Sequence, residues 1–203
     1  PGMDHKETLR DGMRAAAAGG VTSIFEMPNT KPLTTDPDAL QDKLDRAASA
    51  PAVNYAFYFG GTAENAHNLP QWENLPGVCG VKIFMGASTG DLLSETDAKV
   101  DAVLRHGRRV VAAHAEDEAI MKDNRARLID EEGDDVAKHP QWRSVESCLS
   151  ATQRLVRIAR RHGRSVHVLH ITTAEEMAFL AENKDVASVE LLANHLTLHA
   201  PEC

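Results

Sequence analysis

The sequence predicts an α/β fold, a (β/α)8 barrel of the TIM type of which about six central βα units are present. Six short apolar runs alternate with helical patterns along the 203 residues, which is typical of a parallel sheet covered on both faces. Neither glycine-rich nucleotide-binding motif of open α/β sheets occurs. Six units in this length also match the pace of a barrel of about 250 residues, so we expect its first and last strands to be absent. A doubly wound open sheet is the alternative.

The first elements are defined by periodicity and by their ends. Residues 6–18 carry apolar side chains at helical spacing, and two glycines end this helix before the apolar run 21–28, the first strand. Asp36 and Pro37 are a typical N-cap and first-turn pair, so a second helix begins there and extends to about residue 48. The run 53–60 is rich in β-branched and aromatic residues, which favours a second strand.

The central elements follow the same alternation. An irregular piece with short helical turns leads to the third strand, residues 80–85. A helix over 95–106 ends at Gly107, and the apolar run 109–116 forms the fourth strand. The charged segment 117–143 holds at least one further helix.

The last third of the chain predicts two more units. A helix over 144–161 precedes a strand over 165–172. Thr173 and Glu176 form a capping box, so another helix begins there and extends to about residue 183. The run 187–196 is expected to be the last strand.

Two segments of the chain repeat one pattern. In 105-RHGRRVVAAH-114 and 161-RHGRSVHVLH-170, a helix end, a glycine turn, a basic residue and a strand lead to a histidine seven residues beyond the glycine. Both histidines should therefore lie at the carboxyl ends of their strands, the rim where barrels carry their active sites. Alternation along a strand places His167 on the face opposite to His170, toward the helices. We expect His114 and His170 to face each other.

The matched positions of these two histidines indicate a metal site. A lone histidine is more often a hydrogen-bonded core residue than a ligand, but two on neighbouring strands of one sheet favour the metal-ligand interpretation. The other histidines are expected in loops or at helix ends, exposed to solvent. They are His5, His67, His106, His139, His162 and His199.

Lys82 lies inside an otherwise apolar strand, and a buried amine is costly unless it is paired or modified. Its stem could pack while the amine reaches water or a carboxylate. It could also form a Schiff base, act as a general base, or react with CO2 to give a carbamate. A carbamate has two oxygens that can bridge two divalent metals, and the two histidines on later strands favour that interpretation.

Two turns follow strands at the same rim. The segment 27-MPNTKP-32 is explained by turn chemistry alone, although the amide of Asn29 could also hydrogen-bond a polar substrate there. The turn 86-GASTG-90 could suggest an anion nest. It is short, and a backbone cap on the strand end is the simpler interpretation.

Composition excludes some partners. The chain has 22 Lys and Arg against 30 Asp and Glu, a net charge of −8, which argues against a nucleic-acid partner. Its three cysteines are far apart and form no CxxC pair, which favours a reduced, cytoplasmic setting. No apolar run reaches the roughly 18 residues of a membrane helix, and we expect neither a membrane span nor a secretory signal.

Five stretches together resemble the dihydroorotase family of the amidohydrolase superfamily, in the cyclic amidase group that includes hydantoinases and allantoinases. They are 1-PGMDHKE-7, 15-AAAAGGVTSIFEMPNTKP-32, 81-VKIFMGASTGDLL-93, 111-VAAHAED-117 and 167-HVLHITT-173. The resemblance implies that residues 1–203 form a partial metal-dependent amidohydrolase barrel domain. It also implies interconversion of dihydroorotate and N-carbamoyl-L-aspartate in pyrimidine biosynthesis.

The resemblance also implies roles for individual residues. Lys82 matches the catalytic carboxylated lysine that bridges two divalent metals, usually zinc. His114 and His170 match histidine ligands of those metals, and Asn29 matches an asparagine that holds the substrate carboxylate. A small-molecule substrate, a homo-oligomer and a possible association with aspartate transcarbamoylase are further implications.

The sequence departs from the family pattern at several points. A His-x-His pair with a following arginine on the first strand and an aspartate on the eighth strand have no counterpart. Asn194 replaces a histidine that relatives often carry, and His195 could contact the substrate or have no role. Hydantoinase or allantoinase activity is one alternative. A non-catalytic, dihydroorotase-like partner of aspartate transcarbamoylase is another.

Overall fold

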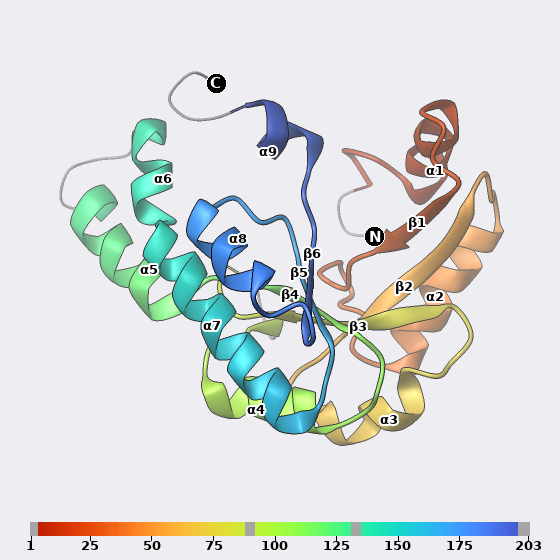
Figure 1. Ribbon diagram of the computed structural model, residues 1–203. Helices are drawn as coiled ribbons and strands as arrows, with labels where there is room; N and C mark the ends of the chain where they lie inside the picture. Colours follow the sequence, from red (N-terminus) through yellow and green to blue (C-terminus); the bar gives the residue numbers. More distant parts are fainter. Residues whose placement is uncertain (1–3, 88–91, 131–134, 199–203) are drawn as a thin grey trace.

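Six parallel strands form one sheet in a computed structural model that describes residues 4–87, 92–130 and 135–198 (Figure 1). The strands are β1 (Ser23–Glu26), β2 (Asn54–Gly60), β3 (Val78–Phe84), β4 (Val111–His114), β5 (Val166–Val168) and β6 (Ala187–Val189). Their order in the sheet is their order in the chain, and every neighbouring pair is parallel. In a doubly wound sheet, the order of the strands across the sheet reverses at a switch point. Here the strand order runs in one sense from β1 to β6, which confirms the half-barrel.

Helices alternate with the strands. They are α1 (Leu9–Ala18), α2 (Pro37–Ala48), α3 (Leu69–Trp72), α4 (Asp97–Arg105), α5 (Glu118–Arg125), α6 (His139–Trp142), α7 (Val145–His162), α8 (Ala174–Ala181) and α9 (Ala193–Thr197). Those with residues in the core, α1 to α4, α7 and α8, cover one face of the sheet. The expected helix starts are confirmed at Asp36 and Thr173, whose side chains accept hydrogen bonds from backbone amides of the first turn. No helix in the described part of the chain has the length and hydropathy of a membrane span.

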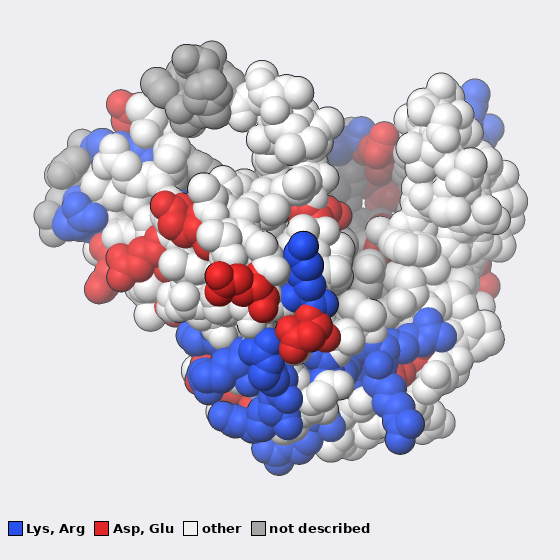
Figure 2. Space-filling model, in the orientation of Figure 1, with Lys and Arg blue, Asp and Glu red and all other residues white. Residues whose placement is uncertain are grey.

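The core lies between the sheet and this helical layer. Apolar side chains of the middle strands, among them Val81, Val111 and Val166, are fully buried and pack with those of α2, α4 and α7. These three valines are in register across β3, β4 and β5, so they share a face. The intervening residues Lys82 and Ala112 must therefore point into the barrel interior. Figure 2 shows the molecule hollowed between α1 and α9.

The expected strand over 187–196 is wrong in its second half. β6 ends at Val189, and Ala193–Thr197 form the short helix α9. Within the described residues, β6 pairs only with β5, itself three residues long. The ladder that would continue the strand stops there, and Leu191 and Leu192 lie partly exposed beyond it.

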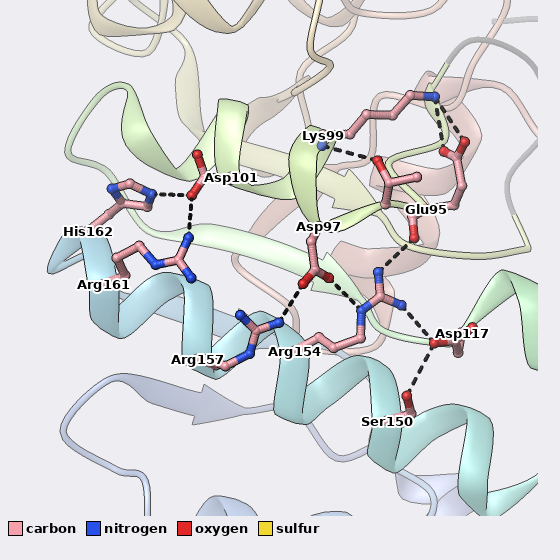
Figure 3. A network of polar contacts seen from close by, with 11 residues as sticks. Glu95, Asp97, Lys99, Asp101, Asp117, Ser150, Arg154, Arg157, Arg161 and His162 are labelled. Carbon is pink, nitrogen blue, oxygen red and sulfur yellow. Dashed lines mark hydrogen bonds and ion pairs between the residues drawn. The ribbon is translucent and has the colours of Figure 1, made fainter.

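A network of charged groups joins α4 to α7 (Figure 3). Asp97 accepts from Arg154 at 2.8 Å and from Arg157 at 2.5 Å. Arg154 also donates to Asp117 at 2.7 Å, and Asp117 caps α5 directly after β4. The network therefore fixes the segment that follows the fourth strand, where the candidate site lies.

Basic side chains gather over the end of α7, at the end of the sheet away from the candidate site (Figure 2). Several of them form ion pairs within the fold. Arg105 and Arg161 both contact Asp101, and Arg160 contacts Asp185 at 2.9 Å. His162, expected to face solvent, is instead largely buried and bonded to Asp101 at 2.8 Å. These charges therefore join neighbouring elements of the fold.

The repeated glycines Gly107 and Gly163 both adopt positive φ, +77° and +60°. Alanine at Gly163 should cost about 1 kcal/mol of stability for the left-handed backbone alone, because its Cβ would meet nothing within 4 Å. A Cβ at Gly107 would collide with the Glu73 carboxylate, which should add about 1–3 kcal/mol. Urea unfolding of the two alanine variants measures this difference. Equal losses would contradict it.

Candidate metal centre

Two histidines meet at the carboxyl ends of β4 and β5. His114 Nδ1 lies 3.2 Å from His170 Nε2, and the ring centroids are 4.9 Å apart. Two nitrogens bound to one tetrahedral zinc at about 2.0–2.1 Å lie roughly 3.3–3.4 Å apart. The spacing of the two rings therefore fits shared ligation, and the expectation that they face each other is confirmed.

His114 reaches this position by simple alternation along its strand. It is in register with Phe84, two residues beyond the pair of Lys82 and Ala112. All four side chains thus belong to the interior face. The geometry of this residue follows directly from the sequence pattern.

His170 reaches the same position by a different route. β5 ends at Val168, and His170 has a φ of +39°, unusual for a residue with a side chain. Glu190 holds this turn through three hydrogen bonds. Its carboxylate accepts from His170 N at 2.9 Å, its amide donates to Val168 O at 2.9 Å, and its carbonyl accepts from Ile171 N at 3.0 Å. Sequence analysis did not identify Glu190.

The expected orientation of His167 is wrong. Val166 and Val168 pack against the helices, so His167 points into the barrel interior and not toward the helical layer. Its Nδ1 lies 2.8 Å from the Ser188 hydroxyl. Alternation would place His167 and His170 on opposite faces only if the strand continued to His170, and the positive φ breaks that continuity.

Lys82 is buried on the interior face, with 2% of its surface exposed. Its Nζ donates to Ile83 O at 2.7 Å and lies 3.6 Å from the centroid of the Phe84 ring. Burial lowers the pKa of the amine well below its usual value, although the Glu190 carboxylate opposes that shift. Within the described residues, the 2% exposure of Lys82 argues against an amine that reaches water. The other chemical alternatives need the neutral amine that burial favours.

A carboxylate and a guanidinium lie behind His114. Glu116 Oε2 is 2.5 Å from His114 Nε2, and Arg143 binds both Glu116 oxygens, with 2.7 Å from Nε to Oε1. Burial would raise the pKa of Glu116, but hydrogen bonds from Arg143 and His114 lower it to about 2. Neither residue was identified from the sequence. Glu116 stands two residues after His114, on the same side of an extended chain, which was the available signal.

A cavity of about 810 Å³ opens beside the two histidines. Its other polar lining residues include His139, Arg143, Thr173, Glu176, Asn194 and His195. Asn194 and His195 thus lie where a substrate could be contacted. Asn29 is exposed beyond β1 and does not line the part of this cavity formed by described residues.

The ligand set is incomplete within the described residues. No group of three or more His, Cys, Asp or Glu side chains is arranged there to hold a metal ion. The candidate ligands are the two imidazoles and the buried Lys82 amine. A carbamate on that amine would add two oxygen ligands. His199 and most of the 86–90 turn lie outside the described residues.

The chain is similar to cyclic amidases over almost its whole length, although no family model matches it. The dihydroorotase of Halobacterium salinarum is 32% identical over 201 residues, covering 98% of this chain and 45% of that protein. The allantoinase of Streptomyces avermitilis is 31% identical, covering 100% and 46%. Among solved structures, the L-hydantoinase (dihydropyrimidinase) from Arthrobacter aurescens aligns with a TM-score of 0.82 at 25% identity, covering 90% and 42%.

The chain thus spans less than half the length of the relatives it matches. Several dihydroorotases are about 30% identical to it. The resemblance to that family and to the wider cyclic amidase group is confirmed, and so is the barrel-type fold.

Proposed function

We propose that this relative of the dihydroorotases is the barrel segment of a metal-dependent enzyme that interconverts dihydroorotate and N-carbamoyl-L-aspartate. The observation that carries the proposal is the His114–His170 pair, whose nitrogens are 3.2 Å apart beside a cavity of about 810 Å³. Dihydroorotases are prominent among the curated relatives. That prominence supports the choice of substrate.

His114 and His170 would hold divalent metal ions, and zinc is among the metals that imidazole ligands suit. Lys82 would join them as a carbamate. In that step the neutral amine nitrogen bonds to the carbon of CO2 and releases one proton to water, which leaves a carbamate whose negative charge is shared by its two oxygens. When bound, the metals supply Lewis acidity to the amide carbonyl and lower the pKa of a bound water.

The chain's own residues would bind and orient the substrate. Asn29 would hold the substrate carboxylate from the end of β1, where its side chain is exposed. Asn194 and His195 line the cavity beside the histidines and could contact the ring. His114 and His170, fixed by Glu116 and Glu190, would keep the metals near this wall.

Several finer proposals accompany the reaction. Residues 1–203 would form one partial barrel domain within a cytoplasmic protein, a homo-oligomer that could associate with aspartate transcarbamoylase. Among the described residues β1 pairs only with β2 and β6 only with β5, which supports the need for further strands. Free Cys79 and Cys148 support a reduced compartment. The acidic net charge of −8 supports the absence of a nucleic-acid partner.

The intact protein should hydrolyse dihydroorotate with a kcat/KM at least about 100-fold above that for hydantoin or allantoin, because a site that pairs with the substrate carboxylate discriminates against rings lacking it. Steady-state assays on the three substrates test this. A chelator should abolish the activity and zinc should restore it. Faster turnover of allantoin or hydantoin would favour the alternative activity, which the allantoinase and hydantoinase relatives support. No turnover and no bound metal would favour a non-catalytic partner.

A further inference from the structure

We infer that Glu116, clamped by Arg143, is a positioning residue that keeps the proton of His114 on Nε2 and turns an unprotonated Nδ1 toward His170. The effect of this arrangement on metal binding rests on the proposed function. The position of the proton on His114 does not, because it depends only on contacts within the chain.

The contacts of Glu116 determine which ring nitrogen carries the proton. Its carboxylate receives hydrogen bonds from Arg143 on both oxygens, and a carboxylate in that state can only accept. Its Oε2 lies 2.5 Å from His114 Nε2, a contact that is favourable only when Nε2 carries a hydrogen.

A competing contact exists and is weaker. Arg143 Nη2 is 3.2 Å from His114 Nε2, and a guanidinium can only donate, so that contact alone would favour an unprotonated Nε2. The same Nη2 lies much closer to Glu116 Oε2, to which it donates one of its two hydrogens. With Glu116 6% exposed, water cannot take over its role, and the carboxylate determines the tautomer.

The consequence concerns the nitrogen that faces the second histidine. With the proton on Nε2, Nδ1 of His114 presents a lone pair 3.2 Å from His170 Nε2. In the metal-free chain, His170 therefore donates the hydrogen between the two rings. A metal ligand must offer a lone pair, so Glu116 prepares His114 for binding before any metal arrives.

The decisive substitution is Glu116→Met, which keeps a side chain of similar length and removes the acceptor. Arg143 Nη2, 3.2 Å from His114 Nε2, can only donate, so it will favour an Nε2 without a proton. His114 must then carry its proton on Nδ1, the nitrogen that faces His170. We expect zinc affinity to fall by about 10–100-fold, measured by competition with a chromophoric chelator.

Nitrogen-15 NMR of the imidazole rings reads the tautomer directly, in the intact metal-free protein. Wild type should show Nε2–H for His114, and Glu116→Met should show Nδ1–H. Glu116→Asp retains a carboxylate and should recover part of the affinity. Glu146→Gln, at an exposed position on α7, loses the same charge and should bind zinc as wild type does. Circular dichroism and thermal melts confirm that each variant folds.

The outcomes separate this inference from the proposed function. A wild-type His114 protonated on Nδ1, or a Glu116→Met variant with unchanged zinc affinity and tautomer, would overturn the inference. The expected tautomer in a wild-type protein that binds no zinc would support the positioning role and contradict the metal-dependent reaction.

Discussion

Replacement of Lys82 by alanine should remove most of the bound metal and lower kcat by on the order of a thousandfold, because the bridging anion between two cations is lost. The amine is buried, and no carboxylate of the described residues forms an ion pair with it. A charged lysine would be costly at such a position. Conversion to a carbamate between metals removes that cost, so Lys82 should matter far more for metal binding than for folding.

Lys43 offers a matched control, since it is equally buried at 1% exposure but is paired. Its Nζ lies 2.9 Å from Glu26 Oε2 and 3.1 Å from Met27 O. Lys43→Met should lower the free energy of unfolding and leave the metal-to-protein ratio unchanged. Lys82→Ala should lower the metal-to-protein ratio and change the free energy of unfolding much less. Elemental analysis and urea unfolding of both variants measure the contrast.

Chemical rescue distinguishes a bridging anion from other roles of Lys82. A short carboxylic acid such as acetate or propionate can enter the space that alanine leaves and supply two oxygens. It should restore part of the metal content and activity to Lys82→Ala. If Lys82→Ala kept full metal content and full activity, the bridging role would be wrong. Rescue by a short amine but by no carboxylic acid would indicate a Schiff base or general base instead.

The fold could be predicted from the sequence because each βα unit carries its own local signals. Asp36 and Thr173 cap helices, and apolar runs mark β1 to β5. The sequential strand order followed from the repeated alternation and the missing nucleotide-binding motifs. The end of the chain was less predictable, because the length of β6 depends on its ladder with β5, which no local pattern records.

The site could be predicted in part. His114 obeys strand alternation, but His170 depends on a positive φ that Glu190 stabilises from the residue after β6. A contact 20 residues along the chain leaves no periodic signal. Arg143, 27 residues from Glu116, was missed for the same reason. Sequence periodicity locates residues on strands, whereas the groups that orient them come from elsewhere in the fold.

The buried pair of Arg164 and Glu73 should be the largest single polar contribution to stability. Arg164 is 3% exposed, and its Nη2 lies 3.0 Å from Glu73 Oε2, while its Nε donates to Arg109 O at 2.7 Å. Glu73 also accepts from the backbone amides of Arg108 and Arg109. The pair therefore joins the end of α3 to the turns that precede β4 and β5.

Removing one partner of such a pair leaves the other buried and uncompensated, which typically costs about 3–5 kcal/mol. Arg164→Met should lose this much in urea unfolding, with wild-type metal content in the fraction that remains folded. Arg160→Met is the matched control, because the Arg160 side chain is 49% exposed beside an exposed Asp185, and such pairs contribute about 0–1 kcal/mol. Equal losses in the two variants would show that the buried pair has no special role. A double variant of Arg164→Met with Glu73→Gln should lose less than the sum of the single losses, since the two groups share one interaction.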